Sequence, residues 1–141
     1  MANLSKSKYI TYCQCPKALW LKQYKPEEMV IDPLTQARFD AGTEVGELAK
    51  RLFGDFVEAT TYKTAADGTQ RLDLGAMAAA TQKALAEGAE NIAEAAFIYD
   101  GCYCAVDLLH KTPHGYAIYE VKSSTDLKEL EVYAQDVAYQ K

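Results

Sequence analysis

The chain has 141 residues, of which 49% are hydrophobic and 25% are charged, and its formal net charge is −5. This length and composition predict a single globular domain, residues 1–141, with enough apolar residues to bury a core. The sequence has no apolar run near the ~20 residues of a membrane-spanning helix and no signal-peptide segment, so we expect a cytoplasmic protein outside the membrane. The negative charge argues against tight, metal-free DNA binding by this domain alone, although lysines cluster near the start: Lys6, Lys8, Lys17, Lys22 and Lys25.

Proline positions and apolar spacing predict two helices in the first third of the chain. A short helix is predicted over Pro16–Tyr24, because proline suits the first helical turn, where its missing N–H is not needed. Its buried side would consist of Leu19, Trp20 and Tyr24. After a loop bracketed by two prolines, apolar residues recur at helical spacing from Leu34 to Phe53 and predict the longest helix.

The rest of the chain alternates between strand and helix patterns. We expect a short strand at Phe56–Ala59 and a polar loop at Thr60–Arg71. A further helix is expected at Leu72–Ala86, followed by a longer strand at Ile92–Tyr99. A last helix is predicted over Leu127–Lys141, capped by the loop Ser123–Asp126. These elements predict an α+β domain with a mixed sheet. Because the sequence stops inside the last helical pattern, we expect a longer protein that is truncated here at the C-terminus.

The most informative stretch is a predicted β-hairpin. Cys102–His110 and Tyr116–Val121 have the composition and alternation of strands, and the Pro and Gly between them suit a hairpin connection. A turn centred there places Asp107 on the first strand opposite Glu120 on the second. Lys122 shares the face of Glu120, because side chains two residues apart on a strand point the same way. Two acids and a lysine would then converge at a strand end.

Two kinds of site fit this convergence, because adjacent carboxylates repel unless a cation lies between them. Lys122 could neutralise Asp107 and Glu120 in a purely structural ion cluster. Alternatively, the two acids hold a divalent cation such as Mg²⁺, which binds one or two carboxylates and keeps several waters. Lys122 would then orient or deprotonate an attacking water, or offset charge on a phosphate. The matched positions of the two acids favour the metal site.

Asp107, followed after a hairpin by Glu120-Val-Lys122, resembles the D…(D/E)xK core of the PD-(D/E)XK nuclease superfamily. The stretch Leu4–Lys17, with its Ser-x-Ser, Tyr and Cys-Pro-Lys, is similar to the opening of the RecB-like branch. That branch includes helicase-associated exonucleases and CRISPR adaptation nucleases. Gly42–Leu48 resembles its helical G-x-x-x-H motif. The resemblance spans nearly the whole chain, with the motifs in the family's order.

The resemblance implies a restriction-endonuclease-like core and a Mg²⁺- or Mn²⁺-dependent nuclease, most simply a DNA exonuclease that acts on ends or single strands. It implies metal binding by Asp107, Glu120 and the backbone carbonyl of Val121, with Lys122 positioning the attacking water. Glu94 falls where many members place a further acid, one strand before the Asp.

The helical motif departs from the family pattern. Gly46 stands where the motif has His, so a nitrogen ligand for the metal is missing. Glu47 or Glu44 could take its place, but each could equally be a solvated helix residue. The departure concerns metal affinity and not the fold.

Two further family features fall in the last helix and near the start. Gln135 with Tyr139 fits the branch's Q-x-x-x-Y spacing, whereas Gln140 lies at the more usual distance from the catalytic lysine. In iron–sulfur members, a cysteine at the position of Cys15 joins three others beyond the nuclease core. Those three would lie past Lys141, so we expect an iron–sulfur cluster only in a full-length protein.

Two functions therefore remain open. The first is a metal-dependent nuclease that hydrolyses phosphodiester bonds. The alternative is a catalytically weak or inactive module of the same fold, which binds nucleic acid or docks within a larger repair or defence protein. The missing histidine, the negative charge and the expected truncation favour this alternative.

Overall fold

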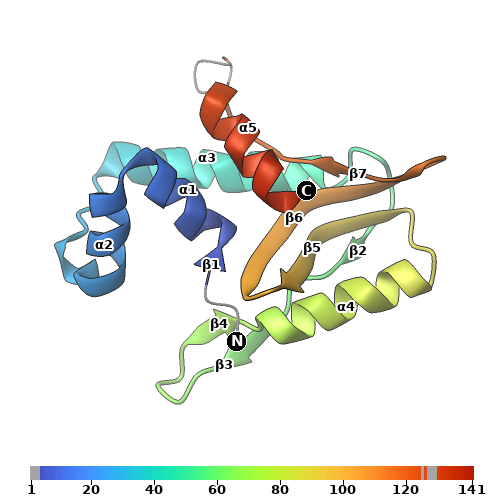
Figure 1. Ribbon diagram of the computed structural model, residues 1–141, viewed down its shortest axis with the longest axis horizontal. Coiled ribbons are helices and arrows are strands. Elements are labelled where there is room, and N and C mark those ends of the chain that lie inside the picture. Colours follow the sequence, from blue (N-terminus) through green and yellow to red (C-terminus); the bar gives the residue numbers. More distant parts are fainter. Residues whose placement is uncertain (1–3, 125, 127–129) are drawn as a thin grey trace.

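The computed structural model describes residues 4–124, 126 and 130–141, and it is an α+β fold with a mixed sheet flanked by helices (Figure 1). This confirms the predicted class at that level. In chain order the elements are β1 (Leu4–Ser5), α1 (Lys6–Gln14), α2 (Pro16–Tyr24), the 3₁₀ turn η1 (Pro26–Glu28), α3 (Pro33–Ala49), β2 (Val57–Glu58), β3 (Tyr62–Thr64), β4 (Gln70–Leu72), α4 (Leu74–Ala86), β5 (Asn91–Tyr99), β6 (Cys102–Thr112), β7 (Gly115–Tyr119) and α5 (Leu130–Gln140).

The sheet is organised around β6. One edge of β6 pairs with β5, and the other edge pairs with β1 near its start and with β7 near its end. β2 pairs with the outer edge of β5. β1 and β2 run parallel to their neighbours, whereas β5, β6 and β7 form an antiparallel meander.

Two short helices follow β1. The hydroxyl of Ser5 caps α1, and Cys15 is extended between α1 and α2. The predicted bounds of α2 are confirmed, but its expected buried side is wrong, because Trp20 and Tyr24 are exposed and only Leu19 is half-buried. α2 packs on α1 with one face only. The opposite face of α2 is not covered by any of the described helices or strands.

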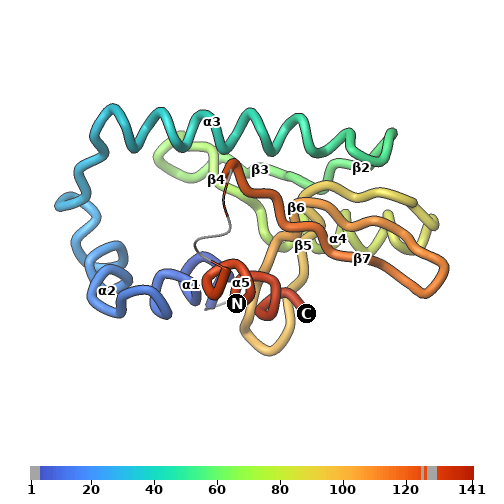
Figure 2. The backbone as a smooth tube through the Cα atoms, turned by 90° about the horizontal axis from the view of Figure 1, so that it is seen from above, coloured from blue at the N-terminus to red at the C-terminus, as the bar shows by residue number. Residues whose placement is uncertain are grey.

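The long helix predicted from Leu34 to Phe53 is α3, which Asp32 caps and which ends at Ala49. Its apolar residues do not form the buried stripe that their spacing predicts, and both Leu34 and Leu48 are exposed. Figure 2 shows α3 running along one side of the molecule, opposite α1 and α5. Among the described elements, none packs closely along it. α3 therefore stands beside the sheet rather than on a core.

The predicted polar loop Thr60–Arg71 is wrong, because β3 and β4 form an antiparallel hairpin there. Asp67 and Gly68 make its turn: the Asp67 carboxylate accepts a hydrogen bond from the amide of Thr69 at 2.9 Å, and Gly68 has φ 81°. An Asp-Gly pair is a strong hairpin signal. All three residues of each strand are exposed, so no apolar alternation marks them in the sequence.

The core lies between α4 and the meander. The predicted helix Leu72–Ala86 and strand Ile92–Tyr99 are confirmed within two residues as α4 and β5. The buried residues Ala84, Ile92 and Val106 pack together in one cluster, and the buried Met77 packs in a second. Burial of these side chains against one helix fixes which face of the sheet is covered.

The register of the meander sets the positions of the acids. β6 and β7 pair from Thr112↔Gly115 to Leu108↔Tyr119, so the next step places Asp107 opposite Glu120. β6 extends two residues beyond its predicted end, whereas β7 begins one residue before and ends two residues before the predicted strand Tyr116–Val121. Pro113–His114 is the connection between them.

α5 occupies most of the predicted last helix and lies against α1 and β6. Its expected first turn, residues 127–129, and position 125 of the preceding loop lie outside the described residues. In the described part of the chain, no helix combines the length and apolar character needed to span a membrane.

Candidate functional site

Three carboxylates occupy neighbouring strands at one level of the sheet. Glu94 on β5 faces Asp107 on β6, since the ladder continues on both sides of this position, and Glu120 directly follows β7. All three line one hollow of about 500 Å³, whose opposite wall is α3. A second hollow, of about 670 Å³, also reaches Glu94 and Asp107. The acids therefore meet in an accessible space.

Glu94 interrupts the β5–β6 ladder. Its φ of 54° lies in the left-handed region, which is costly for a residue with a Cβ. Burial raises the pKa of Glu94, and the nearby Asp107 raises it further. Among the described residues, none makes a hydrogen bond or ion pair with its side chain. Strained backbone and an unpaired acid at one position are typical of functional sites.

Asp107 is held by the chain just beyond β7. Its Oδ2 accepts a hydrogen bond from the backbone N–H of Val121 at 2.7 Å. Burial raises the pKa of Asp107, although this hydrogen bond opposes the change, and the charge of Glu120 raises it further. Asp107 is thus oriented by a neutral donor rather than by a direct ion pair.

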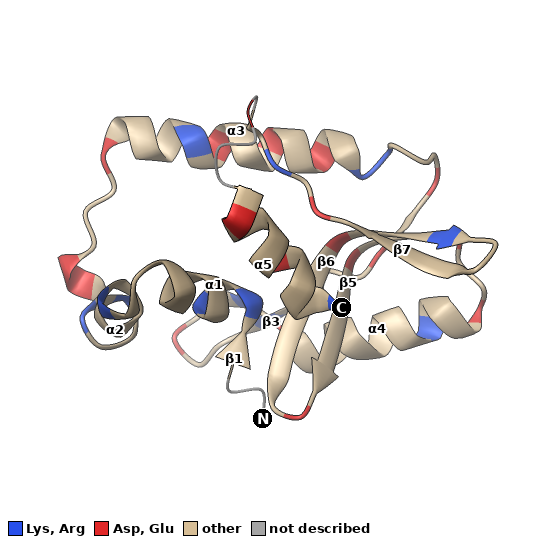
Figure 3. Cartoon of the chain, turned by 45° about the horizontal axis from the view of Figure 1, so that its top comes forward, with Lys and Arg blue, Asp and Glu red and all other residues tan. Residues whose placement is uncertain are grey.

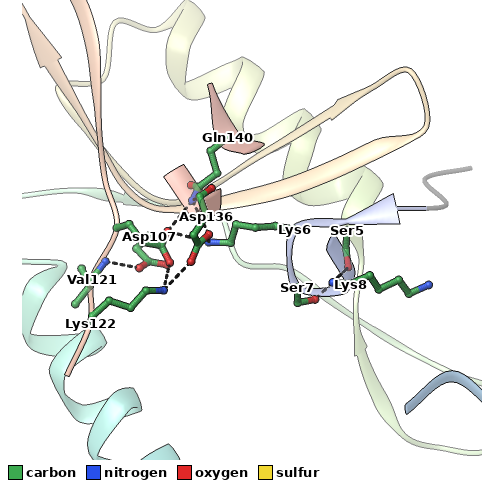
Figure 4. A network of polar contacts seen from close by, with 10 residues as sticks. Ser5, Lys6, Ser7, Lys8, Asp107, Val121, Lys122, Asp136 and Gln140 are labelled. Atoms are coloured by element: carbon green, nitrogen blue, oxygen red, sulfur yellow. Dashed lines mark hydrogen bonds and ion pairs between the residues drawn. The ribbon is translucent and has the colours of Figure 1, made fainter. Parts of the chain in front are cut away.

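Glu120 is bound by cations instead. Its side chain is 6% exposed, and its Oε2 accepts hydrogen bonds at 2.8 Å from both Lys6 and Gln140. Its Oε1 accepts one from Lys122. Figure 4 shows Lys6, Lys122 and Gln140 converging on this cluster from three separate parts of the chain.

Asp136 completes the ion cluster, which consists of Lys6, Glu120, Lys122, Asp136 and Gln140. The sequence prediction did not include Asp136. This buried residue of α5 lies 2.8 Å from the Nζ of Lys122 and 3.3 Å from the Nζ of Lys6. Burial favours a raised pKa for Asp136, but the hydrogen bond from Lys122 and the charge of Lys6 hold its pKa below the usual range. The available signal was an acid four residues before Gln140, on the same side of the predicted helix.

Lys6 is the second functional candidate that the sequence prediction missed. The prediction placed it in a basic cluster near the start, whereas the structure brings it to the acids at the far end of the chain. Burial lowers the pKa of Lys6, but its hydrogen bond and attraction to Glu120 and the charge of Asp136 outweigh this and raise it. The pairing of β1 with β6 and the packing of α1 against α5 bring this residue to the site.

Lys122 is an ammonium group in this arrangement. Burial opposes its charge, but the hydrogen bonds to Asp136 and Glu120 raise the pKa of Lys122 to about 12. At neutral pH it can donate hydrogen bonds and offset negative charge. These properties suit the expected roles of orienting water and offsetting phosphate charge, whereas deprotonating water would need the neutral amine.

The remaining predicted residues divide into those at the cluster and those away from it. Gln140 donates to Glu120 and to Asp136, whereas Gln135 is exposed and its side chain makes no hydrogen bond within the described part of the chain. The hydroxyl of Tyr139 donates to the backbone oxygen of Leu4 at 2.9 Å, and its ring stacks on Tyr9.

The helical acid and the cysteine also lie apart from the cluster. Glu47 borders both hollows but is paired with Lys50 at 2.7 Å. Gly46 faces open space, with no heavy atom of a neighbouring residue within 4 Å of where a Cβ would lie. Cys15 is an exposed free thiol.

Across the described residues, no three His, Cys, Asp or Glu side chains are already arranged to hold a metal ion together. Glu94 and Asp107 nevertheless offer two hard oxygen donors with no direct ion pair, which is the donor chemistry that Mg²⁺ and Mn²⁺ prefer. Comparisons of the chain with protein-family models, curated proteins and solved structures gave no significant match.

Proposed function

We propose that this protein is a metal-dependent nuclease, most simply a DNA exonuclease, with a restriction-endonuclease-like core of the PD-(D/E)XK type. The supporting observation is the row of Glu94, Asp107 and Glu120 on one hollow, with the Lys122 ammonium on its wall. Acids and a fixed cation in one accessible space suit the hydrolysis of a charged phosphodiester. The resemblance of the sequence motifs to the RecB-like branch also supports the proposal.

The residues present fit a hard divalent cation. Asp107 and Glu94 would hold it, and Glu120 and the carbonyl of Val121 could join if Glu120 releases a lysine. When bound, the cation would supply a Lewis acid that polarises the phosphate and the attacking water. Its charge would also offset the two causes that raise the pKa of Asp107 and Glu94, which are burial first and the repulsion of a neighbouring acid second.

The chain's own residues would divide the remaining tasks. A carboxylate oxygen of Glu94 or Asp107 that is not bound to the cation would accept the proton lost when water's oxygen bonds to phosphorus. The P–O bond to the leaving nucleotide breaks in the same displacement, and its oxygen is protonated from solvent. Lys122, protonated throughout, would donate to the phosphate oxygens and lower their charge.

One observation favours the alternative of a non-catalytic module that binds nucleic acid or docks in a larger repair or defence protein. Lys6 and Lys122 already neutralise Glu120 and Asp136 in a closed network. Such a network stabilises a fold without chemistry, and a metal would have to compete with it. The two functions therefore differ in whether divalent cations bind at all.

The test is calorimetric titration of Mn²⁺ into the wild type, Asp107→Asn and Glu87→Ala, followed by assays for cleavage of end-labelled DNA. Asn keeps an oxygen that can accept from Val121, so the fold should survive. Glu87→Ala removes an acid from the end of α4 as a control. We expect Mn²⁺ binding and cleavage in the wild type and control only. Equal Mn²⁺ binding by all three proteins, or no DNA cleavage by any of them, would refute the nuclease and favour the non-catalytic module.

A further inference from the structure

One short arm near the start of the chain is basic, whereas the chain as a whole is acidic. Residues 1–26 contain five lysines and no acid, in a chain whose formal net charge is −5. One of these, Lys6, forms ion pairs with Glu120 and Asp136. The other four lie on α1, on α2 and just after α2. Figure 3 shows basic residues on α1 and α2, both basic and acidic residues on α3, and acidic residues on α5. Such asymmetry indicates an anionic partner for the arm.

Exposed aromatic rings accompany these lysines. Trp20 is 53% exposed and Tyr24 is 66% exposed, and their ring centroids lie 5.6 Å apart. With Lys17 they occupy positions i, i+3 and i+7 of α2, so all three share one side of the helix. Tyr12 on α1 is also more than half exposed. By contrast, Tyr9 stacks on Tyr139 and is not available to a ligand.

The division of side chains on α2 points to a particular ligand chemistry. Its aliphatic residues Ala18, Leu19 and Leu21 are the half-buried ones, and α2 packs on α1. The exposed side carries only aromatic, amine, amide and proline groups. Helices that lie on a lipid surface present Leu and Phe beside Trp, and the exposed side of α2 has neither Leu nor Phe. Rings together with amines match the bases and phosphates of a nucleic acid.

We propose that Lys17, Trp20 and Tyr24 form a binding site for single-stranded nucleic acid, separate from the carboxylate hollow. Unpaired bases stack on the two rings, and Lys17 contacts the phosphate backbone. A duplex hides the base faces that the rings need, so it binds more weakly. α1, nine residues or roughly 13 Å long, connects this site with Lys6 at the acid cluster.

Trp20 is the only tryptophan of the chain, so its fluorescence reports directly on this site. The experiment titrates the protein with oligothymidylate, oligouridylate, a DNA duplex and anionic phospholipid vesicles, in EDTA so that metal-dependent cleavage is absent. We expect saturable quenching by both single strands and weaker binding of the duplex. Tyr24→Ala should weaken single-strand binding about tenfold, because stacking of a base contributes on the order of 1–3 kcal/mol.

Two variants provide the controls. Tyr99→Ala removes a ring that is 84% exposed at the end of β5, and this variant should bind like the wild type. Lys17→Ala should reduce the slope of log affinity against log salt by about 0.7, as expected for one phosphate contact with a single strand.

Three results would overturn the site: no quenching at low salt, equal binding of duplex and single strand, or quenching by vesicles alone. If the protein binds single strands in this assay but does not cleave them with Mn²⁺, the binding site is supported and the proposed nuclease function is wrong.

Discussion

Asp136→Ala tests whether the ion cluster stabilises the fold. Asp136 has a side chain that is only 9% exposed, and it contacts Lys122 at 2.8 Å, Lys6 at 3.3 Å and Gln140 at 3.1 Å. Removing one partner of a buried ion pair typically costs 3–5 kcal/mol, because the other charge stays buried without compensation. Here both lysines retain Glu120, and Lys122 is partly exposed, so the loss should be smaller.

We expect Asp136→Ala to lower the free energy of unfolding by about 2 kcal/mol and the Tm by about 6 °C. Urea and thermal unfolding followed by circular dichroism measure both values. Glu27→Ala is the matched control, since it removes an acid from a surface pair with Lys25 at 3.7 Å, in which both side chains are more than half exposed. Asp136→Asn should fall between the wild type and Asp136→Ala, because it keeps the shape and loses the charge.

An Asp136→Ala variant as stable as the wild type would refute this reasoning. It would mean that the cost of removing Asp136 and its lysines from water cancels their attraction. The cluster would then contribute specificity of packing between α5 and the sheet, and not stability.

Two further predictions concern Lys122 and Glu94. The pKa of Lys122 is raised to about 12, so the stability it contributes is fully present below its ordinary value of 10.5 and is lost as the pH rises through 12. The difference in unfolding free energy between the wild type and Lys122→Gln should therefore shrink between pH 10.5 and 12 in urea titrations, and a constant difference would contradict the assignment. At Glu94, with φ 54°, Gly adopts the conformation without strain, so Glu94→Gly should be more stable than Glu94→Ala by about 1 kcal/mol in the same assay. Equal stability of the two variants would remove the case for strain.

Local patterns predicted the elements well where the chain has strong periodicity or a clear boundary. Pro16 begins α2, and the apolar alternation of the meander marks β5 and β6. The burial of α2 and α3 was not predictable in this way, because apolar spacing indicates a helix even where no other element covers it. The β3–β4 hairpin was missed since its strands are exposed, although Asp67-Gly68 marks its turn.

The site could be predicted only as far as the hairpin register extends. Counting outward from the turn placed Asp107 opposite Glu120, and the ladder leads to the same pairing. Lys6 and Asp136 come from β1–α1 and α5, elements that meet the meander only through tertiary packing. No local sequence pattern predicts that β1–α1 and α5 pack against the meander. The left-handed backbone conformation of Glu94 was not predictable from a local pattern either.

The acids of the site form two groups with different electrostatic conditions. Glu120 and Asp136 share two lysines, and the low pKa of Asp136 indicates that its charged form is favoured there. Glu94 and Asp107 have raised pKa values and no direct ion pair within the described residues. A cation bound beside Glu120 would displace ammonium groups, whereas one between Glu94 and Asp107 would relieve an existing repulsion. The divalent cation that the proposed nuclease needs therefore belongs first between Glu94 and Asp107, and Glu120 would join it only by giving up a lysine.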